Sequence, residues 1–227
     1  MRSLLRSSID LLCPGPSDGK NGKLRQQILD LEVKKRDRNL QQLFELEAHS
    51  PVRSSWIGLG TIAYEVVLHF KPQKIVELGS FKGFSTFAMG LALRDLQRDG
   101  RIYAVDTWMG DKHSGLYEEE VYQSFLENRH KLSLDNTIFP LRMTFAEASK
   151  QITSPIDLLH VDGLHTFKAV TSDFNAFRHL LAPDAIVLFH DVYTKFRGMR
   201  LFWALISRRY PSYRIPYSHG LGVIQIP

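Results

Sequence analysis

The sequence has little cysteine and no long hydrophobic stretch. Cys13 is the only cysteine among 227 residues, which excludes an internal disulfide and any zinc site built from several cysteines. A reducing, cytoplasmic compartment is the simplest expectation. No apolar run approaches the ~20 residues needed to cross a bilayer. The N-terminal stretch MRSLLRSSIDLLCPGP is interrupted by Ser7, Ser8 and Asp10 and has no small-residue cleavage site, so it predicts a short amphipathic helix before Pro14 rather than a signal peptide.

Acidic residues are absent from the C-terminal tail. Tyr193 to Pro227 holds six Lys/Arg and no Asp/Glu, whereas residues 51–192 hold 14 basic and 17 acidic residues. The net charge of +5 is therefore concentrated in the tail. A nucleic-acid-binding protein is expected to carry a broad basic stripe, and no Asn-Pro-Pro-Tyr base-flipping motif occurs, so we expect no nucleic-acid partner. An anionic acceptor, an anionic membrane surface and a merely solvated face all remain open.

Apolar runs alternate with helical patterns along most of the chain. Five such runs separated by helices predict a parallel sheet covered on both faces. The final stretches SYRIPYS and LGVIQIP lie too close for a crossover helix, so they should form an antiparallel hairpin. The expected strands lie at 73–80, 101–106, 136–143, 156–162 and 185–191, and the expected helices at 58–70, 83–97, 117–131, 145–152, 167–181 and 198–210.

The first 50 residues predict a helical extension with a linker, followed by one main domain over residues 51–227. Residues 14–23 are breakers and polar groups, typical of a linker. From Leu24 to about Ala48 the apolar residues fall near one helical stripe. Such a helix packs either on its own domain or on a partner subunit, which would make a homo-oligomer.

A turn bracketed by Gly79 and Gly83 follows the first strand. The glycines let the backbone approach a ligand, and the next helix offers free N–H groups there. The turn is neither GxGxxG nor a P-loop. Glu77 would repel a pyrophosphate, so a cofactor with a cationic amine fits better than a dinucleotide. Asp106 ends the second run, more than about 20 residues past the turn, a spacing that suits the hydroxyls of a ribose. Residues 107–117 have the composition of a lid or of an ordinary surface loop.

Carboxylates and imidazoles follow the fourth and fifth runs. Asp162, His190 and Asp191 form a candidate divalent-cation site, for which oxygen ligands favour Mg²⁺ or Mn²⁺ and a histidine favours Mn²⁺, Fe²⁺ or Zn²⁺. His165, three residues after Asp162, could face the same cavity and remove a hydroxyl proton. The alternative is that these residues cap helices and bind water. His160 lies inside a strand, where we expect a buried, hydrogen-bonded residue.

The segments VELGSFKGFST, AVDTW, HVDGLHTF and LLAPDAIVLFHD, in this order, resemble class I S-adenosylmethionine-dependent methyltransferases. The branch they resemble contains small-molecule and sugar O-methyltransferases, including macrolide-sugar and cephamycin-type relatives. The similarity covers about residues 55–227. It implies an α/β, Rossmann-like, doubly wound seven-stranded sheet, mostly parallel, with a C-terminal antiparallel hairpin and the N-terminal helical extension.

The resemblance also implies roles for individual residues. Asp106 would bind the ribose, His165 would be the catalytic base, and Glu147 would lie near the adenine, although His190 stands where those relatives usually carry Glu or Asp. The full expected sets are, for S-adenosylmethionine, Glu77, Gly79, Ser80, Gly83, Ser85, Asp106, Thr107, Trp108, Glu147 and Asp162, and, for Mg²⁺ or Mn²⁺, Asp162, His190 and Asp191.

The function implied is methyl transfer to a hydroxyl of a small molecule, a sugar or glycan precursor, with assistance from a divalent cation. Two alternatives stay open. One is a metal-dependent, hydroxylase-like relative, and the other is a non-catalytic scaffold that binds the cofactor.

Overall fold

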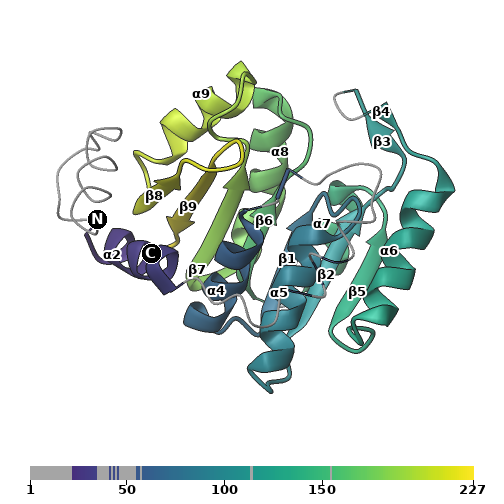
Figure 1. The fold of residues 1–227 in the computed structure, drawn as a ribbon. Coiled ribbons are helices and arrows are strands. Elements are labelled where there is room, and N and C mark those ends of the chain that lie inside the picture. Colours follow the sequence, from purple (N-terminus) through teal and green to yellow (C-terminus); the bar gives the residue numbers. More distant parts are fainter. Residues whose placement is uncertain are drawn as a thin grey trace.

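One seven-stranded sheet forms the centre of the protein, as the computed structural model shows (Figure 1). The structure describes residues 22–34, 41, 43, 45, 55–56, 58–112, 115–153 and 155–227. Across the sheet the strands follow the order β5-β2-β1-β6-β7-β9-β8. Their bounds are β1 (Lys74–Leu78), β2 (Arg101–Asp106), β5 (Ile138–Arg142), β6 (Ile156–Val161), β7 (Leu181–His190), β8 (Ser212–Ile215) and β9 (Leu221–Gln225).

Strand direction follows the connections. Five strands of this sheet, β1, β2, β5, β6 and β7, pair in parallel, because a helix separates each of them from the next along the chain. β9 runs antiparallel to both β7 and β8. The predicted fold class, a mostly parallel Rossmann-like sheet with a C-terminal antiparallel hairpin, is confirmed.

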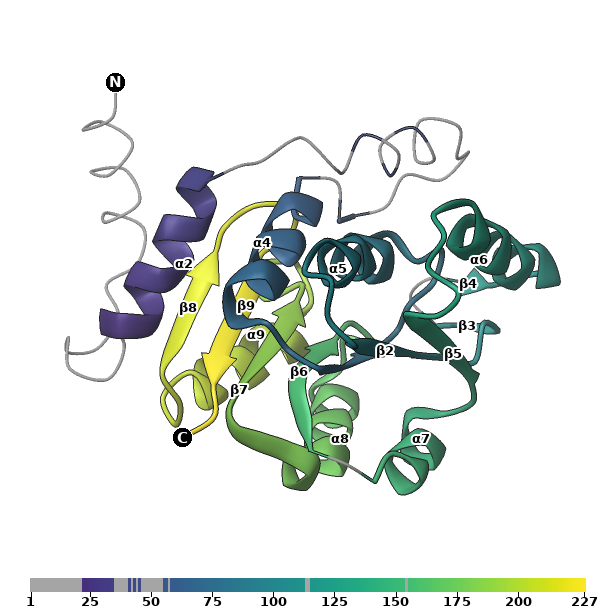
Figure 2. The same cartoon turned by 90° about the horizontal axis from the view of Figure 1, so that it is seen from below.

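Helices cover both faces of the sheet (Figure 2). One face carries α4 (Gly60–Phe70), α5 (Phe84–Asp95) and α6 (Glu119–Lys131), and the other carries α7 (Phe145–Gln151), α8 (Phe167–Phe177) and α9 (Arg197–Ile206). Side chains alternate along each strand, so Ile75 packs into the first core while Val76 and Leu78 pack into the second. The same short strands therefore contribute side chains to both hydrophobic cores.

The N-terminal helix α2 (Gly22–Lys34) packs on its own chain. Leu24, Ile28 and Leu31 are buried, and α2 lies against α4 and β8. Helix α2 begins inside the predicted linker at 14–23. The predicted helix before Pro14 and most of residues 35–54 lie outside the described residues. The homo-oligomer stays a prediction. Within the part that the structure describes, no helix has both the length and the apolar character required to span a membrane.

Two local features differ from the sequence-based expectation. The segment expected as a lid or loop contains a small hairpin, β3 (Gly110–Asp111) with β4 (Gly115–Leu116). The helix expected to reach residue 181 ends at Phe177, followed by a single 3-10 turn at Arg178–Leu180, and β7 starts early at Leu181. The register of β6 against β7 shifts in this first part, where Pro183 has no N–H to donate to a ladder.

Candidate functional site

A cavity of about 480 Å³ lies at the carboxyl ends of the central strands. Four neighbouring strands, β2, β1, β6 and β7, deliver Asp106, Gly79, Asp162 and Asp191 to its wall. Adjacent strands lie about 4.8 Å apart, so this row of groups extends across roughly 14 Å. The aromatic members of the lining are Trp56, Phe81, Phe84, Tyr117, Phe145 and Phe196.

The turn after β1 requires glycine for reasons of space. Gly79 has φ +92°, and a Cβ built on it would lie 2.1 Å from the carbonyl oxygen of Asp162. Gly83 has φ +87° and opens α5. Both glycines line the cavity, as do Ser80 and Ser85. The backbone of this turn can therefore approach a ligand closely.

Asp106 is held at the cavity by backbone amides. Its Oδ2 accepts hydrogen bonds from the amides of Ser80 (3.0 Å) and Phe81 (2.9 Å), and its Oδ1 accepts one from the amide of Trp108 (2.8 Å). Burial raises the pKa of Asp106, and these three amides counter only part of that rise. Each carboxylate oxygen has more than one lone pair, so capacity remains for the hydroxyls of a ligand.

Glu77 lies beneath the cavity rather than on its wall. The side chain is fully buried, and its carboxylate accepts hydrogen bonds from the hydroxyls of Ser80 (2.8 Å), Ser85 (2.7 Å) and Thr86. His160 Nδ1 lies 2.9 Å from Oε1. Glu77 therefore orients the two serines of the turn, and its direct contact with a cofactor stays a prediction. His160 is buried and hydrogen-bonded, as we expected.

Two further predicted cofactor residues do not reach the cavity wall, whereas Thr107 does. Trp108 is buried, donates from Nε1 to the carbonyl of Phe81 (2.7 Å) and packs on Phe125. Glu147 is exposed and forms a capping box with Thr144 at the start of α7. Both side chains serve the local fold.

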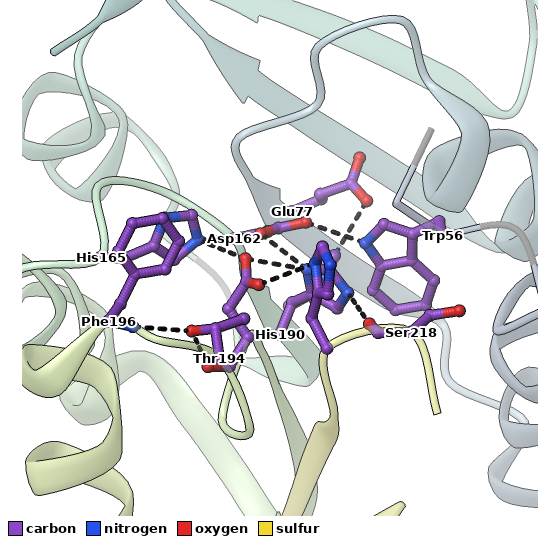
Figure 3. A network of polar contacts seen from close by, with 11 residues as sticks. Trp56, Glu77, Asp162, His165, His190, Thr194, Phe196 and Ser218 are labelled. Carbon is purple, nitrogen blue, oxygen red and sulfur yellow. Dashed lines mark hydrogen bonds and ion pairs between the residues drawn. The ribbon is translucent and has the colours of Figure 1, made fainter. Parts of the chain in front are cut away.

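The opposite end of the cavity carries a charged cluster (Figure 3). His165 Nε2 lies 2.6 Å from Asp191 Oδ2 and 3.6 Å from Asp162 Oδ1. Asp191 adopts φ 63°, a left-handed conformation that costs free energy for a residue with a side chain. This backbone turn coincides with the place where β7 delivers the carboxylate to the cavity.

Both ring nitrogens of His190 contact polar groups of the protein. Nδ1 lies 3.3 Å from Asp162 Oδ1 and 3.2 Å from Asp191 Oδ2, and Nε2 donates to the carbonyl of Ser218 at 3.0 Å. Burial would lower the pKa of His190, but the negative charge of Asp162 and hydrogen bonds to both carboxylates raise it to about 10. Both ring nitrogens of His190 are therefore taken up by contacts within the protein.

Contacts within the cluster also shift the pKa values of Asp162, His165 and Asp191. Burial would raise the pKa of both carboxyls, yet the charge of His190 holds the pKa of Asp162 well below its ordinary value, and hydrogen bonds from His165 and His190 lower that of Asp191. Burial would lower the pKa of His165, but the two carboxylates raise it to about 9. The free site therefore balances two carboxylates with two imidazolium ions.

The donor atoms of Asp162, His165 and Asp191 all lie within 4.8 Å of one another. Two carboxylates and one imidazole make a donor set that fits a divalent cation such as Mn²⁺ or Mg²⁺. The set differs from the prediction, in which His190 was the histidine ligand and His165 the base. The difference arises because His190 faces inward from β7.

Trp56 is a site residue that the sequence did not reveal. Its Nε1 donates to Asp162 Oδ2 at 2.8 Å, its ring stacks on His190, and it meets His160 edge to face. Phe196 was also missed, although its ring stacks on His165 at 4.7 Å. No motif marks either residue, since both precede helices in irregular segments.

Comparison with known proteins supports the same reading of the fold. Three solved structures overlay on most of this chain: the SAH-bound methyltransferase PaMTH1 of Podospora anserina (TM-score 0.65, 15% identity, 94% of this chain and 99% of that one), the O-methyltransferase TomG of Streptomyces achromogenes in complex with SAM (0.63, 15%, 89% and 96%), and an O-methyltransferase of Bacillus cereus in complex with SAH (0.64, 15%, 90% and 97%).

A closer relative in sequence is a protein of Sinorhizobium fredii described as uncharacterized protein y4gI. It is 34% identical over 207 residues, which is 88% of this chain. This chain spans 22% of the length of that relative.

The family described as "Methyltransferase domain" matches residues 76–192, from the middle of β1 to just past β7. That range contains both glycines of the turn, Asp106 and the whole charged cluster at the ends of β6 and β7. It also covers just over half of the sequence, and on this match the chain belongs to the methyltransferase-domain family.

Proposed function

We propose that the protein transfers the methyl group of S-adenosylmethionine to a hydroxyl oxygen of a small molecule. The observation that carries the proposal is the row of groups on four neighbouring strand ends, which runs from a ribose-type carboxylate to a carboxylate–imidazole cluster. Asp106 and the glycine turn suit the nucleoside and amino-acid parts of the cofactor. Asp162, His165 and Asp191 suit the acceptor. SAM- or SAH-bound proteins share this fold.

In the proposed reaction the acceptor oxygen attacks the methyl carbon, the carbon–sulfur bond breaks, and its electron pair stays on sulfur. The cofactor leaves as the neutral thioether, S-adenosylhomocysteine, and the hydroxyl proton passes to the protein. Because the sulfonium methyl is already activated, the protein contributes alignment and proton removal. Phe81, Tyr117 and Phe196 give the cavity wall an apolar part.

His165 is the proposed proton acceptor. Its Nε2 lies 2.6 Å from Asp191, so the carboxylate can orient the ring and stabilise the imidazolium that forms. The neutral form must be present at the moment of transfer, and the positive sulfonium in the same cavity favours that form. Phe196, stacked flat on the imidazole, restricts its rotation.

Asp162, His165 and Asp191 are also the residues that would hold Mg²⁺ or Mn²⁺. Such a cation would supply a Lewis acid that lowers the pKa of the acceptor hydroxyl. His165 cannot be both a ligand and the free base, and the same holds for the two carboxylates, so in that case the hydroxyl proton would leave to solvent. A metal titration therefore decides which role His165 has.

The acceptor class that we infer is a polyhydroxylated one, a sugar or glycan precursor. Carboxylates accept hydrogen bonds from neighbouring hydroxyls, and aromatic faces stack on the apolar face of a sugar ring. At the acceptor end the cavity offers Asp191 together with Trp56 and Phe196. This combination supports a sugar over a purely aromatic acceptor.

The test combines calorimetry with product analysis. S-adenosylmethionine should bind with and without Mn²⁺, and a panel of sugars and nucleotide sugars should yield a product heavier by one methyl group. His165→Ala should lower kcat by about 10²–10⁴-fold with little change in cofactor affinity. The matched control, His179→Ala, removes an exposed imidazole just after α8 and should retain full activity.

Other results would favour the alternatives. A product heavier by one oxygen would indicate the hydroxylase-like reading. Cofactor binding without turnover on any acceptor would favour the scaffold. Absence of cofactor binding would overturn the proposal.

A further inference from the structure

Helix α9 exposes a face that combines arginines with leucines. Its opposite side packs into the core through Met199, Phe202, Trp203 and Ile206. On the outer side Leu201 and Leu205 are 53% and 48% exposed. The α9 patch, as we name this outer face and the turn that follows it, consists of Arg197, Arg200, Leu201, Leu205, Arg208 and Arg209, all exposed. Two large apolar side chains thus lie in water between cationic groups.

The positive charge of the α9 patch is not neutralised by its surroundings. None of its four arginines forms an ion pair with a residue in the described part of the chain. No Asp or Glu follows Asp191 in the sequence. On the neighbouring helix α8, Asp173 is the single acidic residue and is only partly exposed, whereas Lys168 is exposed. The local field is therefore strongly positive.

The α9 patch begins at the rim of the cavity. Arg197 directly follows Phe196, which lines the cavity. The start of α8 touches the start of α9, since a Cβ on Gly198 would lie 2.3 Å from the amide nitrogen of Phe167. Phe167 and Tyr193 add exposed aromatic rings there. Figure 1 places α9 at the same end of the molecule as the β3–β4 hairpin, which also borders the cavity.

We propose that the α9 patch docks the protein on a lipid surface that carries anionic headgroups. Arginines near such a surface are attracted by its negative potential, and leucines beside them enter the headgroup region. A second copy of the chain fits poorly, because a symmetric contact would bring four arginines against four. A soluble anion would use the arginines but would leave Leu201 and Leu205 in water. Of these three occupants, only the lipid surface uses both halves of the patch.

Docking in this orientation places the cavity rim next to the membrane. An acceptor attached to a lipid would then reach the site by diffusion in the plane of the bilayer. This inference concerns where the protein works and stands independently of the proposed reaction, because it is tested by binding alone.

The test is sedimentation of the full chain with vesicles of phosphatidylcholine and phosphatidylglycerol (about 70:30), against phosphatidylcholine alone. We expect binding to the anionic vesicles only, and loss of binding at high salt. Each arginine near the surface should contribute about a fivefold factor. Arg200→Glu with Arg208→Glu should therefore weaken partition by at least about 25-fold. Leu201→Ser with Leu205→Ser, which keeps the charge, should weaken it by about tenfold.

The matched control is Arg98→Glu with Lys150→Glu, which makes the same change in net charge at exposed positions on α7 and just after α5. It should retain binding, and melting curves confirm that each variant is folded. Equal loss in the control would overturn the proposal, since it would show unspecific charge attraction. So would saturable calorimetric binding of free glycerophosphoglycerol, the headgroup alone, because the arginines would then form a soluble-anion site. A dimer in gel filtration that dissociates in the leucine variant would assign the patch to a second copy.

Discussion

The two halves of the cavity recognise ligands by different means. At the ends of β1 and β2 the wall is made of backbone and hydroxyl groups, and its carboxylate, Asp106, is fixed by amides. At the ends of β6 and β7 the wall carries two carboxylates and His165, with His190 behind them. The first half is suited to holding a ligand of fixed shape. The second half has protons to exchange and is suited to chemistry.

The buried carboxylates near the strand ends also differ, in whether they reach the cavity. Glu77 has four donors around it and no surface on the cavity, whereas Asp162 and Asp191 share their donors and reach the cavity wall. A carboxylate near a strand end is therefore a ligand group only when its oxygens remain accessible.

The largest effect that we expect is on stability, from Glu77→Ala. The change leaves three hydroxyls and His160 without their acceptor in a buried site, so the free energy of unfolding should fall by about 3–5 kcal/mol. Chemical denaturation measures the change. Glu147→Ala, which removes the exposed half of a capping box, should cost only about 1 kcal/mol. Similar losses in the two variants would erase the contrast between the buried and the exposed carboxylate.

The next effect tests the binding half. Asp106→Asn keeps the size of the side chain but loses the negative charge that faces the ligand, so the Kd for S-adenosylmethionine should rise about 10–100-fold. Calorimetry measures it. Asp99→Asn, an exposed site just before β2, serves as control and should bind normally. If Asp106→Asn lowered kcat while the Kd stayed constant, the division between a binding half and a chemical half would be wrong.

A smaller effect sharpens the chemical half. Trp56→Phe keeps the aromatic ring beside His190 but removes the N–H that donates to Asp162. We expect kcat to fall about tenfold at nearly constant KM for the acceptor, since a hydrogen bond to a charged group contributes about 1.5–3 kcal/mol. Trp203→Phe, on the buried side of α9, is the matched control. An equal loss there would attribute the effect to general loosening.

The smallest effect concerns pH and lies just outside the cavity. Burial raises the pKa of Asp173 to about 7, above its ordinary value of 3.8. The folded state therefore binds the Asp173 proton more tightly than the unfolded state does. The free energy of unfolding accordingly falls as the pH rises from about 4 through 7. The Tm of Asp173→Asn minus that of the unmodified protein should be about 2–4 °C larger at pH 8 than at pH 5. The partial exposure of the side chain limits this difference. A constant difference across this range would contradict the shift.

Much of the fold could be predicted from the sequence because strand, turn and helix signals agree locally. Gly79, Asp106, Asp162 and Asp191 all line the cavity, and their place at or just past the end of an apolar run is what made them candidates in the sequence. Side-chain direction was harder. Glu77, His160 and His190 occupy the same parity in their strands as Ile75, Leu158 and Leu188, which pack under α4 and α5. Side chains alternate along a strand, so His190, two residues after Leu188, is expected to point to the same side of the sheet as Leu188.

Other parts of the site carry no local signal. Trp56 reaches Asp162 across 106 positions of the chain, and only tertiary packing makes that contact. The β3–β4 hairpin has two residues in each strand, too few for a periodic pattern. Glu147 is an exception, because Thr144 and Glu147 have the spacing of a capping box directly before the predicted helix at 145–152, so its local role was recognisable from the sequence.

Gly79 couples the two halves mechanically. Its α-carbon faces the carbonyl of Asp162 with no room for a methyl group, so any bulkier residue would push the end of β6 outward and displace a carboxylate of the opposite half. Efforts to broaden the range of acceptors should therefore vary the hairpin and the rim, and leave this turn unaltered. A change made here to adjust one substrate would disturb the other.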